Sequence, residues 1–263
     1  MLGKLLKYDL KWIYKLIVVF YILAVVFSVI GRGLIEIENS LVFNILGQIC
    51  IGTAISMMVS SLINCLMRSW VRFSRNMYKD ECYLTHTLPV EKKTIYLSKV
   101  LAAIIAVFTS TILILACLAI CYYSQENIEM LKTVLELAAD TYNTTVVELV
   151  LIIAVMLFVE IVFIVMIGYV GIIIGHKFIS GKMSKSIGIG FLLYMITQVI
   201  SIGILFIAGL FDDRIMNLIN TTEMINVDTI KIIMYAGIIV YLIYVGIYYI
   251  IGKKQLEKGV NVD

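Results

Sequence analysis

The amino-acid sequence predicts an all-α integral membrane protein with six transmembrane helices. The composition is the first observation: 62% of the residues are hydrophobic, 15% are charged and the mean hydropathy is +1.02, outside the range of soluble globular domains. Lipid offers backbone groups no hydrogen-bond partner, so apolar runs of about 20 residues are helices rather than alternating barrel strands. Such runs lie in one transmembrane domain, residues 1–263, near 14–31, 41–66, 100–123, 146–175, 187–211 and 232–251.

The first fifteen residues, "MLGKLLKYDLKWIYK", carry a helical repeat ahead of the first span. Apolar side chains recur on one face, with a stripe of lysines beside them. This pattern is typical of a helix that lies in the inner headgroup layer before the chain enters the membrane. A simple basic flank of the first span is the alternative. The apolar face consists of Leu2, Leu5, Leu6, Leu10 and Ile13, and the basic stripe of Lys4, Lys7, Lys11 and Lys15.

The distribution of lysine and arginine sets the orientation. With the N-terminus in the cytoplasm, the outer side holds few of the 21 basic residues: Arg32, Lys132, Arg214 and Lys231. This agrees with the positive-inside rule. We therefore expect both termini and the loops 68–99 and 176–186 to be cytoplasmic. The net charge of +3 then reflects topology, and we expect no nucleic-acid partner.

Two outer segments have their own patterns. Residues 124–145 place Ile128, Leu131, Leu135 and Ala138 at helical spacing, which predicts a surface helix. Residues 212–229 alternate apolar and polar side chains, as in an outer cap or a short re-entrant helical pair. None of the cysteines falls in a clearly outer loop, so we expect no disulfide framework. They are Cys50, Cys65, Cys82, Cys117 and Cys121.

The longest polar interruption, between the second and third spans, contains the chain's single proline. Pro89 disfavours helix at Leu88 and suits the start of the next one, so it separates a short helix from a long one. Asp80 is the expected cap of the short helix, and Glu81 favours its first turn. Its apolar points form a docking knob on the cytoplasmic side or, alternatively, rest on the lipid surface. These points are Tyr83, Leu84 and Leu88.

Glu160 is the one formal charge well inside a span. An ionised acid at that depth costs about 2.5 kcal/mol or more, so the side chain faces protein or water or is protonated. Gly168, Gly171 and Gly175 share its helix face, and the last two let another helix approach closely. A structural hydrogen bond to a neighbouring helix and a role in substrate passage or conformational coupling are both open.

Uncharged polar stripes mark two further spans. The second span carries Thr53, Ser56, Ser60 and Asn64 on one face, and the fifth carries Tyr194, Gln198 and Ser201. Such stripes bind helices together or line a pathway. Neither is charged enough for an ion-channel filter.

An enzyme would need a constellation of catalytic groups, and the sequence contains none of the familiar ones. There is no His-Glu-x-x-His, Cys-x-x-Cys or Gly-x-Ser-x-Gly. The nearest approach to a phosphate loop, "GHKFISGKM" from Gly175 to Met183, has five residues between its glycines and Met183 where a Ser or Thr must reach magnesium. We expect no catalytic or metal-binding residues and no ATP hydrolysis by this chain.

Several of these stretches together resemble a known family. The lysine-rich start, six spans, and "YLTHTLPV" followed by "KKTIYLSKVLAAI" are similar to bacterial permeases of the type-2 ATP-binding cassette exporter class. The likeness is to small permease subunits linked to antimicrobial-peptide export or immunity. The family's acidic-Gly-Tyr-Leu-Thr pattern stands here as Glu81-Cys82-Tyr83-Leu84-Thr85, with Cys82 in place of the glycine.

The resemblance implies a location in the bacterial plasma membrane and a coupling helix that docks on a cytoplasmic ATPase subunit. ATP and magnesium would be bound by that subunit, and this chain would hold no cofactor. A second permease subunit, identical or different, would complete the complex, with membrane lipid around it. A non-transporting sensor or immunity subunit is the alternative. The implied ATPase-docking residues are Glu81, Tyr83, Leu84, Thr85, His86, Leu88 and Pro89, with a second contact at His176, Lys177, Ser180 and Lys182.

Overall fold

The computed structural model describes residues 1–37, 40–79, 81–142, 144–212, 215–216 and 227–258. All elements in this part of the chain are helices. They are α1 (Leu2–Ile35), α2 (Leu41–Tyr78), α3 (Cys82–Thr87), α4 (Lys92–Tyr122), α5 (Gln125–Thr141), α6 (Val146–Gly175), α7 (Lys182–Phe211) and α9 (Val227–Glu257).

Six of these helices are long and apolar enough to cross a membrane: α1, α2, α4, α6, α7 and α9. The all-helical fold with six candidate spans is therefore confirmed, and it is consistent with a multi-pass membrane protein. The chain divides into two compact units, Met1–Met130 and Leu131–Asn261.

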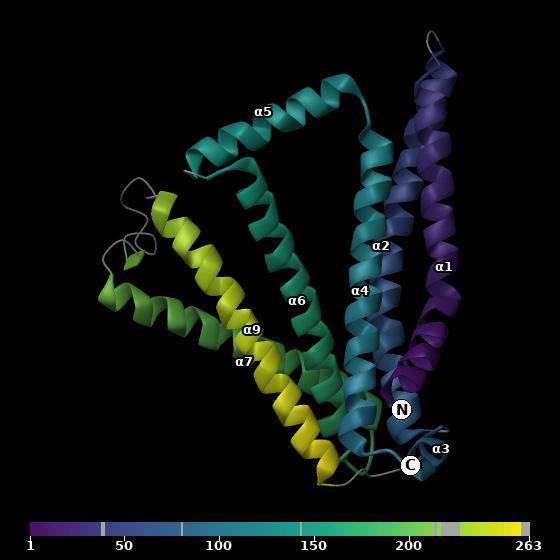
Figure 1. Cartoon of the computed structure of the whole chain (residues 1–263), viewed down its shortest axis with the longest axis vertical. Coiled ribbons are helices and arrows are strands. Elements are labelled where there is room, and N and C mark those ends of the chain that lie inside the picture. The colour runs from purple at the N-terminus through teal and green to yellow at the C-terminus, as the bar shows by residue number, and fades with distance from the viewer. Residues whose placement is uncertain (38–39, 80, 143, 213–214, 217–226, 259–263) are drawn as a thin grey trace. The chain divides into compact units, whose positions relative to one another are not determined.

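In the first unit, α1, α2 and α4 pack side by side (Figure 1). Glycine allows the closest approach of α1 and α2, because a Cβ on Gly31 would lie 3.1 Å from the Gly47 carbonyl oxygen and one on Gly47 would lie 3.0 Å from that of Gly31. Tyr21 on α1 shares a hydrogen bond of 2.6 Å with Ser110 on α4. The helices enclose a core of Ala24, Ala54, Met58, Cys117 and Cys121.

The first fifteen residues do not form a helix of their own. They are the start of α1, which runs without a break for 34 residues, about 51 Å. The lysines of the basic stripe are exposed, whereas Asp9 and Ile13 on the opposite face are buried. The structure therefore shows the expected two faces but not a separate interfacial helix.

The segment 68–99 is more helical than the expected loop. It contains no glycine, and its one proline lies at position 89, so nothing interrupts α2 before Tyr78. The chain becomes extended at Lys79, forms α3, and is extended again at Leu88, as the following proline requires. The second expected loop shortens in the same way, because α6 ends at Gly175 and α7 begins at Lys182.

In the second unit, α6 packs against both α7 and α9. A Cβ on Gly175 would lie 2.5 Å from the Cα of Ser186, and one on Gly171 would lie 2.8 Å from the Ser186 carbonyl oxygen. Only glycine leaves room for α7 at this distance. Phe163 of α6 is fully buried within 6.4 Å, centroid to centroid, of four tyrosine rings: Tyr194, Tyr241, Tyr244 and Tyr248.

The segment 124–145 contains a helix, α5, as its spacing predicts. Ser124 starts it, because its side-chain oxygen accepts a hydrogen bond of 3.0 Å from the Asn127 backbone N–H. Thr145 caps α6 in the same way, accepting from the Glu148 N–H at 3.2 Å. The expected outer cap or re-entrant pair at 212–229 falls mainly on residues outside the described part of the chain, as does Asp80.

Candidate functional site

The C-terminal part of α2 carries three polar side chains on one face. Arg68, Arg72 and Asn76 follow one another at four-residue spacing, so they lie about one turn apart. Arg68 meets α1 through the backbone: its Nε donates a hydrogen bond of 2.9 Å to the Ile13 carbonyl oxygen. Its guanidinium carbon lies 4.2 Å from the centre of the Trp12 ring, a cation–π contact.

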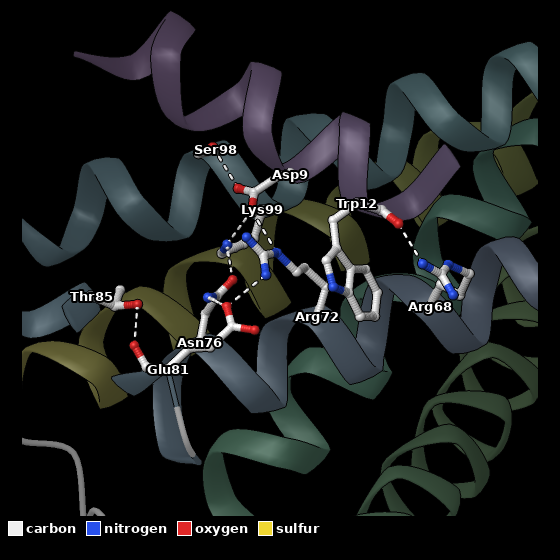
Figure 2. A network of polar contacts seen from close by, with 9 residues as sticks. All are labelled: Asp9, Trp12, Arg68, Arg72, Asn76, Glu81, Thr85, Ser98 and Lys99. Atoms are coloured by element: carbon white, nitrogen blue, oxygen red, sulfur yellow. Dashed lines mark hydrogen bonds and ion pairs between the residues drawn. The ribbon is translucent and has the colours of Figure 1, made fainter. Parts of the chain in front are cut away.

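Asp9 of α1 is the centre of the network (Figure 2). The residue is only 2% exposed, yet each carboxylate oxygen has a partner. Oδ1 accepts from the Arg72 Nε at 3.1 Å and from the Lys99 ammonium, and Oδ2 accepts from the Ser98 hydroxyl at 3.0 Å. A carboxylate this deeply buried requires such partners. The Asp9 carboxylate therefore connects α1 to both α2 and α4.

The contact with α4 is equally buried. Lys99 is 5% exposed and Ser98 is fully buried. The Lys99 ammonium also donates to the Oδ1 of Asn76, which is itself 5% exposed. Asn76 therefore forms a second connection between α2 and α4.

Glu81 joins the short helix α3 to the network. Its Oε2 accepts a hydrogen bond of 2.7 Å from the Arg72 Nη1 and another of 2.6 Å from the Asn76 Nδ2. Arg72 thus bridges the carboxylates of Asp9 and Glu81, one from α1 and one at the start of α3. Ion pairs shared in this way set the position of α3 against the bundle.

The short helix has one buried and one exposed face. Cys82 and Thr85 point inward, at 1% and 7% exposure, and the Thr85 hydroxyl donates to the Glu81 carbonyl oxygen at 2.9 Å. Tyr83 and Leu84 are 67% and 74% exposed, and Leu88, just after the helix, is 42% exposed. The network therefore holds a helix that presents three large apolar side chains to its surroundings.

The charges in the network balance. Two carboxylates, Asp9 and Glu81, meet two cations, Arg72 and Lys99, and neutral groups fill the remaining hydrogen-bonding positions. Removing one member of a buried set leaves another charge uncompensated, at about 3–5 kcal/mol. Among the residues that the structure describes, no group of three His, Cys, Asp or Glu side chains is arranged to hold a metal ion. The geometry is suited to holding four helices in register.

The network lies near the N-terminal end of α1, before the most apolar part of this helix. The exposed face of this helix carries Lys11 and Lys15 in its first turns and Val18 and Ile22 in the next. Asp9 precedes Val18 by nine residues, about 13 Å along the helix.

The residues expected to dock on an ATPase occupy different environments. Tyr83, Leu84, Leu88 and Pro89 are exposed. Glu81 lies within the network, and Thr85 is buried. His86 is half-buried, with Nε2 3.4 Å from the Met77 carbonyl oxygen.

The expected second contact lies between α6 and α7. His176 is 3% exposed, with Nδ1 2.9 Å from the Ile172 carbonyl oxygen, so its ring lies inside the hairpin. Lys177 and Ser180 are exposed, and the Lys177 ammonium donates to the Gln255 side-chain oxygen. Lys182 is half-buried at the start of α7.

The polar residues of the spans lie in both units. Glu160 is half-buried on α6, and no described residue forms a hydrogen bond or ion pair with its carboxylate. Gln198 joins α7 to α9, since its Nε2 donates to the Tyr241 hydroxyl at 3.3 Å. Gly168 is half-buried on the same helix as Gly171 and Gly175.

On α2, the stripe of small polar residues bonds to its own helix. Ser56 is exposed, and its hydroxyl donates to the Gly52 carbonyl oxygen at 3.0 Å. The Asn64 Nδ2 donates to the Ser60 carbonyl oxygen at 2.8 Å. The buried face of α2 lies elsewhere, at Ala54 and Met58.

The expected site residues included Glu81 but none of its partners in the network. One signal in the sequence indicates them: Asp9 is an acid on the apolar face of the first helix, opposite the lysines. A charge on an apolar face requires a buried partner. No protein-family model, curated protein or solved structure matches this chain.

Proposed function

We propose that the chain is the permease subunit of an ATP-driven exporter, with α3 as the helix that docks on a separate ATPase. The observation that carries the proposal is α3 itself. It exposes Tyr83 and Leu84 on one side and is held on the other by the ion pair between Glu81 and Arg72. A helix that exposes large apolar side chains and is fixed in position by an ion pair is suited to contact with another protein.

The six candidate spans supply the membrane part of such a subunit. The excess of basic residues at the end that carries α3 supports a cytoplasmic location for it, and hence for both termini. The bacterial plasma membrane follows from the family resemblance. Because the chain has one set of six candidate spans, the family resemblance implies a homodimer or heterodimer of permeases with two ATPase subunits.

In this mechanism the ATPase subunits close on ATP and magnesium and push α3. Glu81 passes the displacement to Arg72 on α2, and Asp9 passes it on to α1 and, through Lys99, to α4. The three helices α1, α2 and α4 then tilt together, because independent movement of one of them would separate the buried ion pairs of Asp9. Substrates compatible with the apolar and mildly polar spans are peptides, drugs and lipid-like molecules.

A non-transporting membrane partner, such as a sensor or immunity subunit, is the second candidate. The same exposed face of α3 supports it, since docking on an ATPase does not require a substrate path. Substrate flux in vesicles containing both subunits separates the two functions: the permease moves substrate on ATP addition, and the sensor does not.

The proposal is tested by co-purification, in nanodiscs, with a candidate phosphate-loop ATPase from the same organism. The test variant is Leu84→Asp with Leu88→Asp, which places charge on the exposed face. Tyr8→Asp is the matched control, because Tyr8 is 65% exposed on α1 and receives the same change.

We expect the ATPase to bind the wild type and the control and to be lost from the double variant. Equal binding to all three chains would move the contact to the 176–181 hairpin, where Ile179 is 96% exposed. Absence of binding to the wild type would contradict both functions.

A further inference from the structure

Helix α5 is amphipathic. At 100° per residue, its large apolar side chains occupy about half of the helix surface, and its charged side chains occupy the other half. The apolar half consists of Ile128, Met130, Leu131, Val134, Leu135 and Leu137. The polar half consists of Glu126, Glu129, Lys132, Glu136 and Asp140.

The apolar face of α5 is uncovered. Met130, Leu131, Val134 and Leu137 are 67%, 59%, 53% and 62% exposed, and Ile128 is 47% exposed. Apolar side chains along about three turns of helix form a surface whose exposure to water is unfavourable. Something of apolar character therefore covers it.

The chain carries α5 directly out of one candidate span and into another. Only Tyr123 and Ser124 separate it from α4, and α6 begins five residues after its end. Figure 1 shows the chain turning at this point, so that α5 starts across the direction of α4. Tyr122 and Tyr123 at the turn are 50% and 68% exposed, as in the aromatic belts that mark membrane interfaces.

We propose that α5 is a membrane-surface helix that lies in the lipid headgroup layer, with its apolar face in the acyl boundary and its acidic face in water. Three candidate spans precede it, so it lies on the side opposite the N-terminus. The inference is independent of the ATPase, since it rests on α5 and its two neighbours alone.

A lipid surface explains the face better than a protein partner does. Both ends of α5 are tied to candidate spans, so the helix is confined to the depth at which headgroups meet acyl chains. The polar half carries four carboxylates against Lys132 alone, which pairs with Glu136 at 3.8 Å. This acidic surface agrees with the outer side, where basic residues are few.

The test places a bimane fluorophore on single cysteines in a variant whose native cysteines are replaced by alanine. Leu131→Cys and Val134→Cys report on the apolar face. Glu129→Cys and Glu136→Cys are the matched controls on the opposite face. Each protein is reconstituted in nanodiscs of phosphatidylcholine with and without bromine on the acyl chains.

We expect brominated lipid to quench the fluorophore at 131 and 134 at least about twofold more than at 129 and 136, because apolar faces of surface helices sink about 5–10 Å. Equal quenching on both faces would overturn the proposal. Shielding of 131 and 134 from both brominated lipid and aqueous iodide would also overturn it, in favour of a protein partner.

A second pair of variants covers the case in which the cysteine-free protein does not fold. Leu131→Trp and Glu129→Trp retain all native cysteines, and their difference spectra against the wild type remove the signals of Trp12 and Trp70. A blue-shifted, bromine-quenched emission at 131 and a water-like emission at 129 are expected. Matching emission at the two positions would contradict the proposal.

Discussion

Three side chains compensate the buried charge of Asp9. It accepts from Arg72, Ser98 and Lys99 while only 2% exposed. Replacing Asp9 with asparagine keeps the size of the side chain and removes its charge. The buried ammonium of Lys99 then loses its closest counter-charge, so the free energy of unfolding should fall by about 3 kcal/mol or more.

Thermal unfolding in detergent, followed with a thiol-reactive dye, measures this change. The dye is suited to the chain because Cys65, Cys82, Cys117 and Cys121 are all buried. Glu91→Gln is the control, since its ion pair with Lys93 is exposed and such pairs contribute little. Asp9→Asn combined with Lys99→Met should recover part of the loss. An Asp9→Asn protein as stable as the control would show that the network does not stabilise the fold.

Glu81 contributes less to stability than Asp9 does, because its side chain is 37% exposed. Glu81→Gln weakens the attachment of α3 by about 1 kcal/mol, which should raise local opening of α3 roughly fivefold. The reactivity of the Cys82 thiol reports on this opening directly, since the residue is only 1% exposed when α3 is in place. We expect its alkylation rate, followed by mass spectrometry of the peptide, to rise in Glu81→Gln and not in Glu91→Gln. Unchanged alkylation would mean that other contacts hold α3.

Among the elements, the crossing of α6 and α7 depends on glycine. A Cβ on Gly175 would lie 2.2 Å from the Ser186 Oγ and 2.5 Å from its Cα, so the helices must separate to accept alanine. Gly175→Ala should destabilise the protein by about 1–3 kcal/mol. Gly203→Ala is the matched control, because no atom lies within 4 Å of its Cβ position and alanine favours helix.

The same thermal assay compares the two glycine variants. We expect a lower melting temperature for Gly175→Ala and an unchanged or higher one for Gly203→Ala. Equal melting temperatures would show that α6 and α7 adjust to the extra methyl group without cost.

The sequence predicts the elements well and their contacts poorly. Apolar runs alone are sufficient to place α6 at residues 146–175, since lipid demands helix over that length. They do not predict that α2 continues to Tyr78, because its last turns are polar and are held by tertiary ion pairs. Glu81 stands out as the acid directly before α3. Its hydrogen-bond partners are five and nine positions earlier, on α2, and Arg72 connects it further to Asp9 on α1. The hydropathy of the sequence does not indicate which charged residues pair across helices.

For the whole molecule, the proposed topology of six membrane crossings places both termini on one side and α5 on the other. Epitope tags at residue 1, after residue 263 and within α5 at Glu136 test this in intact cells. An antibody should reach the tag at Glu136 without permeabilisation and the terminal tags only after it. Staining of a terminal tag in intact cells would contradict the orientation.

The most direct test of the central claim, that α3 docks on an ATPase, is photo-cross-linking from position 84 in living cells. A benzoylphenylalanine replaces Leu84, which is 74% exposed, and in a control protein it replaces Tyr8, which is 65% exposed. We expect a covalent adduct with the ATPase subunit from position 84 and none from position 8. Failure to capture the ATPase from position 84, or equal capture from both positions, would contradict it.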